Sequence, residues 1–168
     1  MKMEIAFYLD GLKRNAESFR SMLNGVPAGW KSSPGKWSLL EIVCHLRDEE
    51  KEDFRARLQS VLEDPSKAFS PIDPQGWVLS RRYGEQKFDE AAEAFFRERE
   101  ASLAWLASLK NPAWENTYLH PAIGPMSAKF ILSNWLAHDY LHMRQIMKLK
   151  YDYLGFCSEE NLGYAGEW

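Results

Sequence analysis

The sequence lacks the features that mark several large classes of protein. It has only two cysteines in 168 residues, Cys44 and Cys157, which is too few for a disulfide framework. Reduced thiols, and therefore a cytoplasmic location, are expected. No apolar run of about 18 residues predicts a transmembrane helix, and the charges within the first helix-like stretch are not those of a secretory signal.

The sequence also lacks an excess of charge of one sign. Acidic and basic residues are interspersed and the formal net charge is −3, which gives no electrostatic reason to expect nucleic acid as a partner. Hydrophobic residues make up 45% of the chain, enough for a packed core rather than a disordered segment. The length fits one domain, so we expect a single domain over residues 1–168.

Neither convincing strands nor repeats are found, and four amphipathic stretches dominate instead. Apolar residues at spacings of three and four predict helices over residues 3–24, 38–62, 89–110 and 127–153. Ser38 and Glu41 form the pattern of a capping box, and Asp89 and Ser127 are expected N-caps. These elements predict an all-α fold, a four-helix bundle. The proline-rich connection over residues 64–77 would permit a crossover between the second and third helices.

The stretch "WLAHDYLHMRQI", residues 135–146, places His138 and His142 on the apolar face of the fourth helix. Residues at i and i+4 lie on the same face with Cβ atoms about 5–6 Å apart, so both imidazoles can reach one metal ion. A third ligand should come from another helix, and His45 is the candidate. His120, in a loop between prolines, is not expected to be a ligand. The alternative interpretation is a pair of histidines at the edge of the core, hydrogen-bonded to carboxylates.

The charged residues near His45 suggest supporting roles. Glu49 follows His45 by four residues and shares its face, so it is the candidate catalytic group, a proton shuttle. Arg99 interrupts an apolar stripe, and a buried guanidinium requires a partner, which we expect to be an acid of the second helix. Asp48 or Glu49 could also orient a histidine. A solvated acidic face is nevertheless the favoured interpretation for each of Asp48, Glu49, Glu50 and Glu52.

Three segments together resemble the DinB/YfiT-like superfamily. They are "GKWSLLEIVCHLRDEE" at the start of the second helix, "HPAIGPMS" before the fourth, and "AHDYLHMRQI" within it. The resemblance extends over nearly the whole chain, including the final "YAGEW". It implies a four-helix bundle of up-down-down-up order that holds a divalent metal, often nickel or zinc, on three histidines. Carried over by motif position, those ligands are His45, His138 and His142.

The resemblance also implies a range of functions. Characterised relatives include S-transferases and isomerases that use low-molecular-weight thiols, and homodimers are common. We therefore expect a metal-dependent thiol S-transferase or hydrolase that acts on a small molecule. A non-catalytic module that binds a metal or ligand is the alternative, with Tyr164 and Trp168 of the tail folded across the bundle mouth. A purely structural bundle with satisfied histidines is the third possibility.

Overall fold

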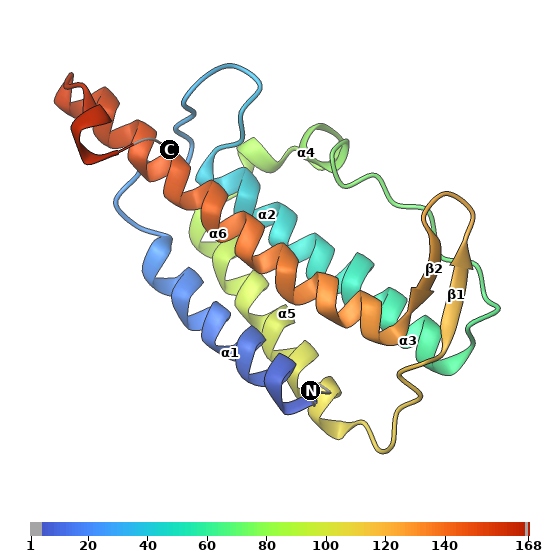
Figure 1. Cartoon of the computed structure of the whole chain (residues 1–168). Helices are drawn as coiled ribbons and strands as arrows, with labels where there is room; N and C mark the ends of the chain where they lie inside the picture. The colour runs from blue at the N-terminus through green and yellow to red at the C-terminus, as the bar shows by residue number, and fades with distance from the viewer. Residues whose placement is uncertain (1–4, 167) are drawn as a thin grey trace.

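Four long helical segments lie side by side in the computed structural model, which describes residues 5–166 and 168 (Figure 1). They are α1 (Ile5–Met22), a continuous stretch that begins with α2 (Leu39–Glu49), then α5 (Phe88–Ser108) and α6 (Ala128–Ser158). Helix α1 packs against α5 and α6, and α2 packs against α5. The predicted four-helix bundle is confirmed, whereas the up-down-down-up order and the single domain over 1–168 stay predictions. The expected helix start at residue 3 lies outside the described residues.

The second helical stretch contains a turn that the sequence did not predict. Helix α2 continues into a π-helix, η1 (Glu50–Arg55), and then into α3 (Ala56–Glu63). The predicted capping box is confirmed at its start, because Ser38 Oγ accepts from the Glu41 amide at 3.3 Å and Glu41 Oε2 accepts from the Ser38 amide at 2.8 Å. A π-turn inserts an extra residue into a helical turn and is frequent at functional sites. Here it directly follows the segment that carries His45 and Glu49.

The connection between α3 and α5 returns along the length of the bundle in Figure 1. It contains two short helices, α4 (Trp77–Ser80) and η2 (Tyr83–Glu85). A crossover of this kind is what the long proline-rich segment permits. It places residues 74 and 75 close to α2, at the cavity described below.

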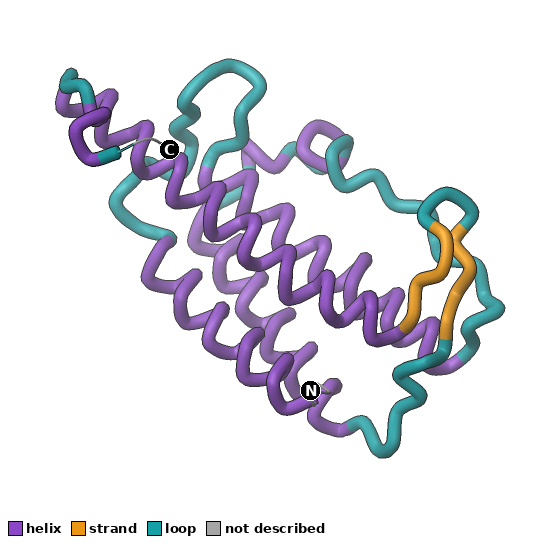
Figure 2. The backbone as a smooth tube through the Cα atoms, viewed as in Figure 1, coloured by secondary structure: helices purple, strands orange, loops and turns teal. Residues whose placement is uncertain are grey.

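A two-stranded antiparallel hairpin precedes α6, so the expectation of no strands was wrong (Figure 2). Strand β1 (Thr117–His120) pairs with β2 (Gly124–Ser127), with Thr117 opposite Ser127. Strands of four residues are too short for an alternating pattern to stand out. The turn is held by His120, whose Nδ1 accepts from the amides of Ala122 and Ile123, each at 3.2 Å.

The helix boundaries differ from prediction at two points. Ser127 caps α6 as expected, accepting from the Phe130 amide at 3.0 Å. Helix α5 begins at Phe88, so Asp89 is not its N-cap but an acid in its first turn, where the helix dipole favours negative charge. Helix α6 continues to Ser158 and is followed by η3 (Leu162–Ala165). No helix among the described residues has the length and apolar character needed to cross a membrane.

The core consists of two apolar clusters with a polar layer between them. One cluster contains Phe19, Phe95 and Ile146, and the other contains Leu12 and Trp135. Each of these side chains is almost fully buried, and such burial stabilises a fold by roughly 1.5–3 kcal/mol per side chain. Along each helical stretch at least one buried polar residue falls between residues of the two clusters, and Asn15, Glu50, Arg99 and Asp139 are among them.

Candidate functional site

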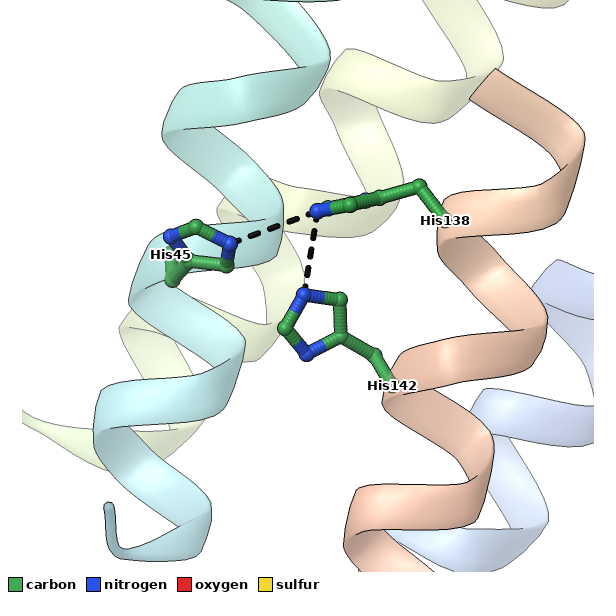
Figure 3. A group of neighbouring side chains, drawn as sticks. All are labelled: His45, His138 and His142. Carbon is green, nitrogen blue, oxygen red and sulfur yellow. Dashed lines mark hydrogen bonds between the residues drawn. The ribbon is translucent and has the colours of Figure 1, made fainter. Parts of the chain in front are cut away.

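Two facing helices bring the three candidate histidines together (Figure 3). His45 projects from α2, while His138 and His142 lie one turn apart on α6. The Nε2 atom of His138 is 3.4 Å from Nε2 of His45 and 3.0 Å from Nε2 of His142. One nitrogen from each ring lies within 4.8 Å of the others. The predicted juxtaposition across the bundle is therefore present.

A hydrogen bond on the far side of the His142 ring orients that ring. The Nδ1 atom of His142 is 2.8 Å from Gln145 Oε1, and because an amide oxygen only accepts, Nδ1 carries the proton. The Nε2 atom of His142 is then left with a lone pair that points into the cluster. His45 Nδ1 is buried without a hydrogen bond of normal geometry, although the Pro74 carbonyl close to it acts to raise the pKa of His45. Such contacts fix the tautomer of a ligand histidine.

The environment keeps the rings uncharged. Burial and, to a smaller extent, the neighbouring His142 lower the pKa of His45 to about 3. Burial and the two other histidines lower the pKa of His138 to about 2. The pKa of His142 is also lowered, mainly by burial. Neutral imidazole is the form that binds metal, so the protein holds the three rings ready for a cation.

The residues fit a divalent cation on two counts. Two nitrogens bound to one tetrahedral ion at about 2.0–2.1 Å lie about 3.3 Å apart, which agrees with the 3.4 and 3.0 Å separations here. Hydrogen bonds alone cannot satisfy all the ring nitrogens that face one another in the cluster. A neutral ring has one N–H, and that of His142 is donated to Gln145. One cation accepts all three lone pairs at once.

Glu49 lies beside the cluster, as its spacing from His45 predicted. Its Oε2 atom is 3.8 Å from His138 Nε2, and its side chain is buried. Burial, the negative charge of Asp53 and a hydrogen bond shared with that carboxyl together raise the pKa of Glu49 to about 8. The positive charge of Arg57, which pairs with Asp53 at 2.8 Å, acts in the opposite direction and lowers the pKa of Glu49. The raised pKa favours the protonated form of Glu49, and its carboxyl lines the same cavity as the histidines.

The histidine cluster lines a cavity of about 440 Å³. Two loops contribute its other walls, residues 35–37 before α2 and residues 74–75 of the crossover. The ring of Trp37 lies 4.8 Å from that of His45 and 6.5 Å from that of His142, nearly parallel to the latter. The cavity has room for a small molecule beside the three imidazoles and Glu49.

The acidic run after His45 is not a solvated face, which corrects the favoured expectation. Asp48, Glu49 and Glu50 are all buried, and only Glu52 is substantially exposed. Asp48 does not orient a histidine by a hydrogen bond. Its carboxylate instead accepts from side chains of its own helix and of the crossover: Arg47, Arg81 and Tyr83.

Arg99 pairs with an acid of the second helical stretch, as predicted, and with a second acid that was not. It donates to both oxygens of Glu50, at 2.8 and 2.9 Å, and to both oxygens of Asp139, each at 2.8 Å. Glu50 also accepts from Trp135 and Asp139 accepts from Asn15. This network joins the helices that carry the histidines. The signal that could have found Glu50 is its spacing of seven residues from Val43 on the apolar stripe.

Cys44 and the tail lie away from the cluster. The Cys44 thiol is buried, directed at Gln86 Oε1 at 3.5 Å, and burial raises its pKa to about 11. Tyr164 is fully exposed and does not line the histidine cavity, so it does not fold across the mouth as one interpretation required. Trp168 lines a neighbouring cavity instead and packs against Tyr151.

Comparisons with known proteins agree with this architecture. The sequence profile described as the DinB superfamily matches residues 12–146, a span that includes the three histidines and Glu49. No curated protein gives a significant match. Among solved structures, YfiT from Bacillus subtilis superimposes with a TM-score of 0.78 at 15% sequence identity, over 90% of this chain and 88% of that chain. YfiT is described as a probable metal-dependent hydrolase with an unusual four-helix bundle topology.

Proposed function

The chain belongs to the DinB superfamily, and from that premise we propose that it is a divalent-metal-dependent enzyme that hydrolyses a small molecule. The observation that carries the proposal is the convergence of three buried or half-buried imidazoles beside the buried carboxyl of Glu49 in one cavity. The description of YfiT as a probable metal-dependent hydrolase supports the same reaction class.

In this proposal His45, His138 and His142 hold the ion through their Nε2 atoms. Three protein ligands leave a coordination position open, as in catalytic rather than structural sites. Imidazole ligands suit nickel and zinc, which remain the expected metals. A divalent ion in this place supplies Lewis acidity toward the substrate and the nucleophile. Gln145 keeps the His142 ring in the tautomer that leaves Nε2 free.

Glu49 is the proposed proton-transfer group. Its Oε2 atom lies 3.8 Å from His138 Nε2, and burial raises the pKa of its carboxyl, which favours the protonated form that can donate a proton to a leaving group in the cavity. Asp53 shares a hydrogen bond with Glu49 and stabilises the protonated form.

Hydrolysis and thiol transfer make different demands on the cavity. A thiol-dependent S-transferase needs a place for a low-molecular-weight thiol as well as an electrophile. No described residue favours a thiol over water, so thiol transfer is the second outcome of the test below. The homodimer and the cytoplasmic location remain predictions.

The test compares turnover by the metal-loaded chain and by matched histidine variants. Protein made without a histidine tag is loaded with zinc or nickel and assayed on 4-nitrophenyl esters, and separately on a chloro-aromatic electrophile with a thiol. Ester hydrolysis that is lost in His142→Ala and kept in His120→Ala supports the proposal. Thiol-dependent release of chloride with no ester hydrolysis would replace it with the S-transferase. Equal background rates in all three proteins would leave a non-catalytic or structural bundle.

A further inference from the structure

A second and larger cavity adjoins the histidine cavity. It has a volume of about 820 Å³ and shares four lining residues with the first. The shared residues are Lys36, Trp37, His142 and Gln145. The wall between the two spaces is therefore made of side chains that face both. A molecule that enters the larger cavity comes within reach of His142.

The larger cavity is basic, although the chain as a whole is acidic. Three basic residues line it, Lys36, Arg144 and Lys148, against one acid, Asp152. Lys148 is already paired with Asp152. Among the described residues, Lys36 and Arg144 form no ion pair, and both are exposed. Two positive groups without a partner thus face a cavity in a protein whose net charge is −3.

The remaining wall of this cavity is largely apolar. Leu141 and Leu149 contribute from α6, Trp37 from the loop before α2, and Trp168 from the tail. An anionic group with an apolar body would find both kinds of contact here. A simple inorganic anion would use the basic groups alone.

The helix geometry sets how long such a molecule must be. A helix rises about 1.5 Å per residue, so Lys148 lies about 9 Å beyond His142 along α6, and Arg144 about 3 Å beyond it. Arg144 and Lys148 therefore lie farther along α6 than the histidines, in the wall of the adjoining cavity, whereas Lys36 lies between the two cavities. A reacting group at the cluster and an anionic group several bonds away can be held at the same time.

We propose that the substrate carries a carboxylate or phosphate at the end of a short apolar chain, held by Lys36 and Arg144 with Lys148 nearby, while its reacting group lies at the histidine cluster. The identity of the reacting group rests on the proposed function, whereas the anion subsite does not. Arg and Lys bind carboxylate and phosphate through the same charge-assisted hydrogen bonds, so both belong to the proposed class.

The kinetic test uses two esters that differ only in charge. These are 4-nitrophenyl hydrogen adipate and its neutral methyl ester. With the metal-loaded protein we expect the acid to have a kcat/KM about tenfold higher, an effect of KM. The double variant Lys36→Gln/Arg144→Gln should bring the ratio of the two kcat/KM values to about one; the ratio is the readout, because Lys36 also lines the histidine cavity. The control Arg14→Gln/Lys129→Gln changes one exposed arginine and one exposed lysine outside the cavity. It should keep the preference for the charged ester. Lys148 is left unchanged because its replacement would leave Asp152 without its partner.

A binding test separates failure of the subsite from failure of the proposed hydrolysis. Titration calorimetry with hexanoate, hexyl phosphate and hexanamide needs no turnover. We expect both anions to bind about tenfold more weakly to the double variant, and hexanamide to show no difference. Comparing the two anions tells a carboxylate site from a phosphate site. Anion binding that is equal in wild type and double variant would place the anion at the histidines and overturn the proposal. Loss of binding in the double variant without any ester hydrolysis would support the subsite and reject hydrolysis.

Discussion

Arg99 and Asp139 form a two-pronged ion pair in the middle of the bundle, with both N–O distances at 2.8 Å and both side chains 1% exposed. Asp139 follows His138 directly in the chain, and Arg99 reaches Glu50 on the other side at 2.8 Å. The guanidinium therefore links α6 to the helical stretch that carries His45. Burial opposes the charge on Arg99, but the two carboxylates outweigh it and raise its pKa further above the ordinary value.

Replacing Arg99 with methionine should destabilise the fold strongly. The change leaves two buried carboxylates without their cation, and breaking a buried pair in this way costs about 3–5 kcal/mol. The stability of Arg99→Lys should lie between those of wild type and Arg99→Met. The lysine keeps the positive charge, but an ammonium cannot make two planar contacts. Urea denaturation at pH 7 measures the free energy of unfolding.

The matched control for Arg99 is Arg97 on the same helix. Arg97 pairs with Glu93 at 3.6 Å, and both side chains are about two-thirds exposed or more, 67% and 73%. Arg97→Met should change the unfolding free energy by no more than about 1 kcal/mol. If the two methionine variants unfold at the same urea concentration, the central role given to the Arg99 network is wrong.

Metal affinity should decrease from wild type to Gln145→Leu and again to His142→Ala. Wild type is expected to bind one zinc or nickel ion per chain, and a free metal concentration of 100 times Kd should add about 2.7 kcal/mol of stability. Gln145→Leu removes the hydrogen bond to the His142 ring but none of the three ligand nitrogens, and should weaken metal binding by roughly 10–100-fold. His142→Ala removes a ligand and should weaken it more than that.

His120→Ala is the control in the metal titration, because it removes a histidine that holds the hairpin turn instead. It should bind metal as the wild type does. Calorimetry on protein without a histidine tag gives both stoichiometry and Kd. Unchanged Kd in His142→Ala would rule out the proposed ligand set.

Glu49→Gln should separate proton transfer from metal binding. The amide keeps the shape of the side chain but cannot release a proton, so kcat should fall by about 10²–10⁴-fold. Metal stoichiometry should stay at the wild-type value, since Glu49 lies beside the three nitrogens and not among them. Glu52→Gln, on the same stretch but 40% exposed, should retain full activity. Equal kcat in Glu49→Gln and wild type would remove Glu49 from the mechanism.

The sequence predicted the parts of this site that follow from local spacing. The i, i+4 relation placed His138 and His142 on one face, and the Ser38–Glu41 pattern located the start of α2. That His45 faces them across the bundle depends on how α2 and α6 are arranged; the residues alone made His45 only a candidate, and the family resemblance supported it. The role of Arg99 could be inferred because a buried guanidinium requires a carboxylate.

The acids were misjudged because their partners are distant in sequence. A run such as "RDEEKED", residues 47–53, has the local composition of a solvated surface. Glu50 is buried by contacts with Arg99 and Trp135, which lie 49 and 85 positions away. The π-turn η1 was also beyond prediction, since an inserted residue within a charged run leaves no mark on an apolar period of 3.6.

Asp48 should make stability depend on pH in the acid range. Burial raises its pKa, but hydrogen bonds from Arg47, Tyr83 and Arg81 outweigh burial and hold the pKa below the ordinary value of 3.8. The lowered pKa in the folded state means that the unfolded chain takes up the proton first as the pH falls. The stabilisation by Asp48 is therefore fully present above the unfolded pKa and is lost as the pH drops through the folded one. Asp48→Asn should be less stable than wild type at pH 7 by about 1.5–3 kcal/mol, the usual contribution of hydrogen bonds to a charged group.

The pH profile of that difference is the test. The gap in unfolding free energy between wild type and Asp48→Asn should be constant from pH 8 to about pH 5 and narrow below about pH 4, as the carboxylate is neutralised. Asp89→Asn, an exposed acid in the first turn of α5, should show a much smaller gap at every pH. A gap for Asp48→Asn that widens toward acid would mean that the carboxyl is protonated in the folded protein. The three donors around it would then not be stabilising a charge.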